Sequence, residues 1–181
     1  SNSVQDATAS LVSNRGMLTK VYIPRLMFPL TSVIAKLVDY SISLMILIGL
    51  MIWFQVVPTV GLFIIPLLTL LMMLSAAGIG MWLSALAVQF RDVKYGSNFL
   101  IQLLMYCSPV VYATSIVPEK YVIFYALNPM VGIIEGFRSA FLATNPMPWL
   151  LIGIGTVTSG IMFITGIIYF KKMERSFADV A

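Results

Sequence analysis

The chain has 181 residues, of which 60% are hydrophobic and 10% are charged, and its formal net charge is +4. A soluble globular domain carries about a quarter charged residues, so this composition excludes one. The apolar residues form long uninterrupted runs instead of alternating stretches, which excludes an outer-membrane barrel. The sequence therefore predicts an all-α polytopic membrane protein, in which the basic excess reflects topology and lipid contact.

The reactive side chains are few. Histidine is absent, and Cys107 is the single cysteine. A structural zinc site, a Ser-His-Asp or Cys-His catalytic arrangement and an intrachain disulfide are therefore excluded, and we expect no catalytic, cofactor-binding or metal-binding residue. The chain begins at Ser1 without an initiator methionine or a signal-peptide pattern, so we expect its natural N-terminus to lie upstream.

The N-terminal residues 1–36 are predicted to lie in the cytoplasm or at the membrane interface. Within them, residues 18–30 are basic and amphipathic, and Pro24 and Pro29 are expected to keep this segment separate from the first span. The segment is either a docking element for a soluble partner or a helix lying on anionic headgroups, and composition alone favours the helix on headgroups. The first span is predicted at residues 37–57, a length that covers about 31 Å as a helix.

Ionisable and small residues in the first two spans have structural interpretations. Asp39 follows Lys36 by one helical turn, which predicts a structural ion pair at shallow depth. Ala76, Gly80 and Ser84 fall four residues apart, which permits close helix packing within the chain or, less simply, at a dimer seam.

Three further spans are predicted, at residues 60–88, 97–117 and 149–170, followed by a cytoplasmic tail at residues 171–181. The first of them carries no charge and is too long to cross upright, and Pro66 near its start predicts a bend or an interfacial first turn.

Residues 118–148, between the last two spans, are too apolar for an ordinary loop. They contain an apolar run at residues 121–134 that is too short to cross a bilayer and is split by Asn128 and Pro129. An exterior re-entrant or interfacial helical hairpin fits this pattern best.

Two groups of side chains near this hairpin have alternative interpretations. Glu135 and Arg138 can pair at i, i+3, either as a solvated surface pair of little value or as part of a cap on the exit of a pathway. Four tyrosines could stack on sugar rings or could belong to an ordinary interfacial belt. These are Tyr106, Tyr112, Tyr121 and Tyr125.

Basic residues predict the orientation. With the N-terminus inside, nine of the 11 lysines and arginines are cytoplasmic, and Lys120 and Arg138 are exterior. The nine are Arg15, Lys20, Arg25, Lys36, Arg91, Lys94, Lys171, Lys172 and Arg175.

Five sequence blocks occur here in a characteristic order: residues 18–30, residues 87–93, residues 108–112 with 117–120, residues 125–138 and residues 173–180. Together they resemble the membrane permeases of ATP-binding-cassette exporters of the polysaccharide, O-antigen and teichoic-acid type. The resemblance implies a permease of six spans, of which this chain holds the last four. It also implies a homodimer and two copies of a cytoplasmic ATPase subunit.

The resemblance also implies roles for particular residues. Coupling to the ATPase would involve a coupling helix at about residues 18–30 and the cytoplasmic loop after the second span. The residues are Lys20, Val21, Tyr22, Ile23, Pro24, Arg25, Arg91 and Asp92. The exterior hairpin would lie on the substrate path, with the four tyrosines and with Asn128, Pro129, Glu135 and Arg138.

No P-loop pattern G-x-x-x-x-G-K-[ST] occurs in the sequence, so ATP and Mg²⁺ are expected in the partner subunit. The hypothesis is a permease that exports a lipid-linked polysaccharide across the bacterial inner membrane and performs no covalent chemistry itself. The alternatives are an exporter of a drug or small lipid, an enzyme acting on polyprenyl-linked sugars through Asp39, Asp92 or Glu135, and a purely structural membrane subunit.

Overall fold

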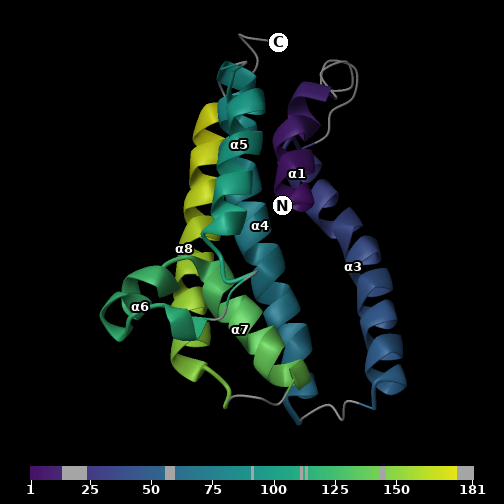
Figure 1. Cartoon of the computed structure of the whole chain (residues 1–181). Helices are drawn as coiled ribbons and strands as arrows, with labels where there is room; N and C mark the ends of the chain where they lie inside the picture. The colour runs from purple at the N-terminus through teal and green to yellow at the C-terminus, as the bar shows by residue number, and fades with distance from the viewer. Residues whose placement is uncertain are drawn as a thin grey trace.

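The computed structural model describes residues 1–13, 24–55, 60–90, 92–110, 112, 114–142 and 146–174. In these ranges the chain is helical and contains no strand, which confirms the predicted all-α class (Figure 1). The α-helices are α1 (Asn2–Ser13), α3 (Met27–Trp53), α4 (Ile65–Gln89), α5 (Val93–Tyr106), α6 (Glu119–Ala126), α7 (Pro129–Leu142) and α8 (Trp149–Glu174). Two short 3-10 helices, η1 (Val60–Ile64) and η2 (Thr114–Ile116), precede α4 and α6.

Among the described ranges, three helical segments are long and apolar enough to cross a membrane: α3, α4 with η1 from Gly61 onward, and α8. They correspond to the spans predicted at residues 37–57, 60–88 and 149–170. Pro66 lies in the first turn of α4, directly after η1, so the helix type changes where the proline was predicted to interrupt the span.

The span predicted at residues 97–117 is not one continuous helix. The helix α5 has 14 residues, about 21 Å, and ends at Tyr106, after which the chain turns. Pro109 is fully buried, has no N–H to donate, and disfavours helical geometry at Ser108 before it. The span predicted at residues 97–117, the third along the chain, is therefore replaced by a short helix followed by a broken segment.

The first span begins well before the predicted position, because α3 starts at Met27 and includes Pro29. The prediction that Pro29 separates the basic segment from the span is therefore wrong. Proline is tolerated in a first helical turn, where the N–H has no intrahelical acceptor. Lys36 pairs with Asp39 at 3.2 Å, as predicted, and also with Asp6 of α1 at 3.1 Å.

The helix α1 was not predicted and is part of the core. Val4, Ala7 and Leu11 are buried, and their spacing of three and four residues places them on one helix face. This face packs against α4 and α3. Residues 2–13 therefore form a helix that packs against other helices of the chain.

The central helix is α4, which contacts α8, α1, α7 and α3. Figure 1 shows α8 and α1 on opposite sides of α4, with α3 extending away from it. Ala76, Gly80 and Ser84 are all buried, and a Cβ on Gly80 would lie 2.7 Å from the Cβ of Ala7. The prediction that these small residues serve packing within the chain is confirmed.

A close crossing of α7 and α8 generates a stability prediction. A Cβ on Gly132 would lie 2.2 Å from the carbonyl oxygen of Leu151, so any side chain there forces the two helices apart. We expect Gly132→Ala to destabilise the protein by about 1–3 kcal/mol, measured as a lower thermal unfolding midpoint in mild detergent. Gly153→Ala on α8 is the matched control, because nothing lies within 4 Å of a Cβ there. Equal midpoints for the two variants would contradict this packing.

Candidate functional site

The predicted hairpin region contains two helices, α6 and α7, separated at Asn128 and Pro129 as the sequence indicated. They lie beside α8, near the lower end of α5 in Figure 1. A polar cluster joins this helix pair to the broken segment after α5. We call it the hairpin node and define it as Ser108, Tyr112, Tyr125, Asn128, Glu135 and Arg138.

Asn128 connects the α6–α7 junction to the broken segment. Its Nδ2 donates a hydrogen bond to Oγ of Ser108 at 2.9 Å, and its Oδ1 accepts one from the backbone N–H of Met130 at 3.1 Å. The second bond caps α7, in which Pro129 occupies the first position and needs no hydrogen-bond acceptor. The Asn-Pro pair therefore starts α7 and at the same time fixes it to Ser108.

Glu135 and Arg138 are the charged centre of the node. The Arg138 guanidinium pairs with Oε1 of Glu135, which also accepts a hydrogen bond from the backbone N–H of Thr114 at 3.2 Å. Nη2 of Arg138 donates to the carbonyl oxygens of Pro109, at 2.9 Å, and of Tyr112, at 3.4 Å. The side chains are 7% and 24% exposed, so the expectation of a solvated surface pair is wrong.

The four tyrosines do not form one cluster. The hydroxyl groups of Tyr112 and Tyr125 are 2.7 Å apart, and their ring centroids are 6.4 Å apart. Burial raises the pKa of Tyr125, and the hydrogen bond to Tyr112 raises it further, so the phenol stays neutral. Tyr106 and Tyr121 are 62% and 56% exposed, and their rings lie outside this pair.

Most of the predicted coupling residues lie outside the described residues: Lys20, Val21, Tyr22, Ile23 and Arg91. Pro24 precedes α3, and Asp92 is exposed directly before α5. Arg25 donates a hydrogen bond from Nη1 to the carbonyl oxygen of Glu174 at 2.9 Å. The described part of the coupling segment is thus attached to the last residue of α8.

The node is suited to holding backbone in place rather than to covalent chemistry. Glu135 is already bonded to Arg138 and to Thr114, and no group of three histidine, cysteine or acidic residues within the described ranges could hold a metal ion. Sequence reasoning singled out Glu135, Arg138 and Asn128 but not Ser108 as a partner. The Ser-Pro sequence at the helix break was the signal that could have indicated it.

Removal of the Arg138 charge should destabilise the protein. Arg138→Gln would leave the buried Glu135 carboxylate and two backbone carbonyls without their strongest donor, at a cost of about 3 kcal/mol. Lys120→Gln is the control, because it removes one positive charge from an exposed position on the neighbouring helix. Thermal unfolding of the purified proteins in detergent measures both. Equal thermal unfolding midpoints for Arg138→Gln and Lys120→Gln would show that the Arg138 contacts do not stabilise the protein.

Comparison with known proteins places this arrangement among transporter sequences. The ABC-2 type transporter family model matches residues 2–142, a range that includes α1, α4 and the node. The chain is 26% identical to an O-antigen export system permease protein RfbA of Klebsiella pneumoniae, over 99% of this chain and 69% of that protein. It is 27% identical to the protein of the same name from Myxococcus xanthus, over 97% and 68%.

Proposed function

Because the chain belongs to the ABC-2 type transporter family, we propose that it is the permease half of an ATP-driven exporter that moves a lipid-linked polysaccharide across the bacterial inner membrane. A member of this family is a membrane-embedded transport permease and not an enzyme, and it works with an ATP-binding-cassette ATPase. The observation that carries the proposed substrate is similarity along nearly the whole chain to permeases named for O-antigen export. Because the sequence has no P-loop, ATP and Mg²⁺ would bind to the partner.

The proposed assembly contains two copies of this chain and two ATPase subunits. Its support is the large apolar surface of α3, which buries Pro29 and Val33 and exposes large side chains such as Met45, Ile52 and Trp53. A second permease copy and membrane lipid would cover this surface, as an apolar span requires.

The proposed orientation has both ends of this chain in the cytoplasm and the α6–α7 pair outside as a re-entrant hairpin. The distribution of basic residues supports it. The C-terminal ends of α4 and α8 lie at one end of the structure in Figure 1, and the C-terminal end of α3 and the start of α4 lie at the other.

The proposed coupling element is the basic segment that includes Lys20–Arg25, with the Arg91–Asp92 loop. Its support is positional, since Arg25 is bonded to the end of α8 and Asp92 immediately precedes α5. Nucleotide-driven movement of this segment would therefore act directly on two helices, one of which packs against the α7 side of the hairpin. Such coupling requires contacts that differ between two states of the transporter.

The substrate path is proposed to end at the hairpin. Tyr106 and Tyr121 expose their rings and could stack on sugar faces, whereas Tyr112 and Tyr125 bond to each other and would position the hairpin. In this arrangement Asn128, Pro129, Glu135 and Arg138 keep the broken backbone in place beside the path, where irregular backbone is tolerated.

Charge reversal in the coupling segment should weaken ATPase binding. We expect Lys20→Glu to reduce recovery of the ATPase with the tagged permease by about fivefold or more. A glutamate there would repel the acidic ATPase surface that the basic segment is proposed to contact. Lys20 is preferred to Arg25, since Arg25 also holds α8. Lys120→Glu, on the proposed exterior side, is the control. Recovery equal to wild type, from a variant that migrates normally in gel filtration, would contradict the coupling assignment.

Deletion of the gene tests the proposed substrate. We expect loss of a surface polysaccharide and accumulation of its lipid-linked precursor on the cytoplasmic side, with both defects reversed by the wild-type gene. An intact surface polysaccharide together with altered drug resistance or altered lipid distribution would favour export of a drug or small lipid instead.

A further inference from the structure

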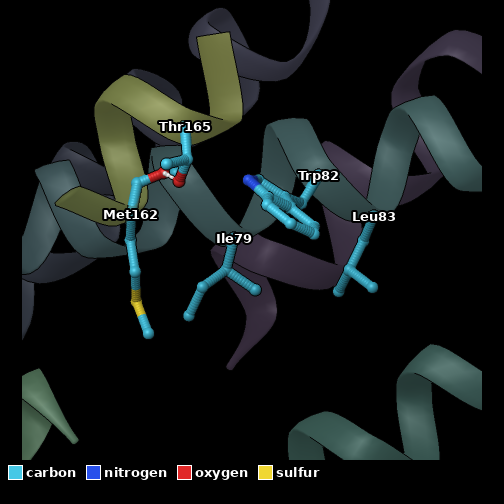
Figure 2. Close-up of a pocket in the computed structure, with 6 residues that line it drawn as sticks. Ile79, Trp82, Leu83, Met162 and Thr165 are labelled. Carbon is cyan, nitrogen blue, oxygen red and sulfur yellow. Dashed lines mark hydrogen bonds between the residues drawn. The ribbon is translucent and has the colours of Figure 1, made fainter. Parts of the chain in front are cut away.

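A groove separate from the hairpin node runs between α4 and α8, with a volume of about 280 Å³. Figure 2 shows Ile79, Trp82 and Leu83 of α4 on one side and Met162 and Thr165 of α8 on the other. Its base is a close helix crossing, where a Cβ on Gly166 would lie 2.8 Å from the carbonyl oxygen of Gly78.

The lining side chains carry two polar groups, the hydroxyl of Thr165 and the indole N–H of Trp82. Oγ1 of Thr165 donates within its own helix, to the carbonyl oxygens of Ile161 at 2.7 Å and Met162 at 3.2 Å. The other lining side chains are hydrocarbon, thioether or indole. Both helices are long and apolar enough to cross a membrane, so the occupant that fits the groove chemically is an acyl chain.

The α8 side of the groove leads to a positively charged helix end. Met162, Thr165, Tyr169 and Lys172 follow one another at steps of three and four residues, so they share one face of α8. Lys172 is exposed and lies about 10 Å along the axis from Thr165. That distance suits an acyl chain in the groove and its headgroup beside the lysine.

Two aromatic residues at the lysine end of the groove mark the approach to the headgroup region. The rings of Trp82 and Tyr169 stack with centroids 5.0 Å apart and planes inclined by 18°. Tryptophan and tyrosine concentrate at the membrane interface, and a lysine near a helix end extends toward the lipid phosphates.

From these observations we propose that the groove between α4 and α8 binds one anionic phospholipid, with an acyl chain against Trp82 and Thr165 and the phosphate at Lys172. The site does not depend on the identity of the exported substrate. A lipid bound there fills the space beside the Gly78–Gly166 crossing and thereby supports the packing of the two central spans.

Quenching of Trp82 fluorescence by brominated lipid tests this site locally. Trp53→Phe and Trp149→Phe leave Trp82 as the single tryptophan of the three in the full chain. The protein is reconstituted into vesicles that contain equal fractions of phosphatidylglycerol and phosphatidylcholine, with bromine on the acyl chains of one lipid at a time. We expect the brominated phosphatidylglycerol to associate with the site about fivefold more strongly, the factor expected for one lysine near an anionic lipid.

Two pairs of variants separate the headgroup from the acyl chain. Lys172→Gln should remove the preference for phosphatidylglycerol, whereas Lys171→Gln, the same change on the neighbouring face, should leave it within about twofold. Thr165→Phe should fill the groove and reduce quenching by both lipids. Thr156→Phe is the control, because Thr156 is exposed elsewhere on α8.

Three results would overturn the proposal. Equal quenching by the two lipids in the parent protein would indicate ordinary surrounding lipid. Equal effects of Lys171→Gln and Lys172→Gln on the lipid preference would indicate that the positive helix end attracts anionic lipid in general, without a specific site. Absence of quenching by either lipid would show that protein, such as a second copy of the chain, covers the groove.

Discussion

The contact between Arg138 and the broken backbone after α5 is the constraint on which the hairpin region depends. A helix that is interrupted where its backbone is shielded from water leaves carbonyl groups without intrahelical donors, and apolar surroundings cannot supply replacements. At the interruption near Pro109, the guanidinium of Arg138 donates hydrogen bonds to two backbone carbonyl oxygens and also pairs with the buried carboxylate of Glu135. Among the described residues, no buried side-chain nitrogen or oxygen lacks a partner. The break, the helix α7 and, through Gly132, the helix α8 are thereby joined into one unit.

The sequence was sufficient to predict the elements whose formation depends on local properties. Length and hydrophobicity determined the three long spans, and the Asn128-Pro129 pair marked the division between α6 and α7. Two elements depended on context instead. The helix α1 has few apolar residues, and its stripe from Val4 to Leu11 matters only because α4 presents small residues opposite it. The end of α5 was misplaced because an apolar run continues past Pro109, and hydrophobicity alone does not distinguish a straight span from a broken one.

The candidate site was predictable in composition but not in geometry. The i, i+3 spacing indicated a pair between Glu135 and Arg138. The pair is buried because Pro109 and Thr114, which precede α6 in the sequence, contact it through their backbone groups. The tyrosines illustrate the same limit, because the hydroxyl groups of Tyr112 and Tyr125 meet, whereas the rings of Tyr106 and Tyr121 are exposed. Such contacts between distant segments depend on tertiary packing, which local spacing does not encode.

Export itself is measured most directly by reconstitution. The tagged permease and its co-purified ATPase are inserted into vesicles with lipid-linked polysaccharide extracted from the native membrane, and a glycan-specific antibody reports polysaccharide on the leaflet opposite the ATPase. We expect this signal to rise on addition of ATP and Mg²⁺ and to stay at baseline with a non-hydrolysable analogue. A signal that remains at baseline with ATP, in vesicles whose ATPase hydrolyses it, would contradict polysaccharide export as the function of this permease.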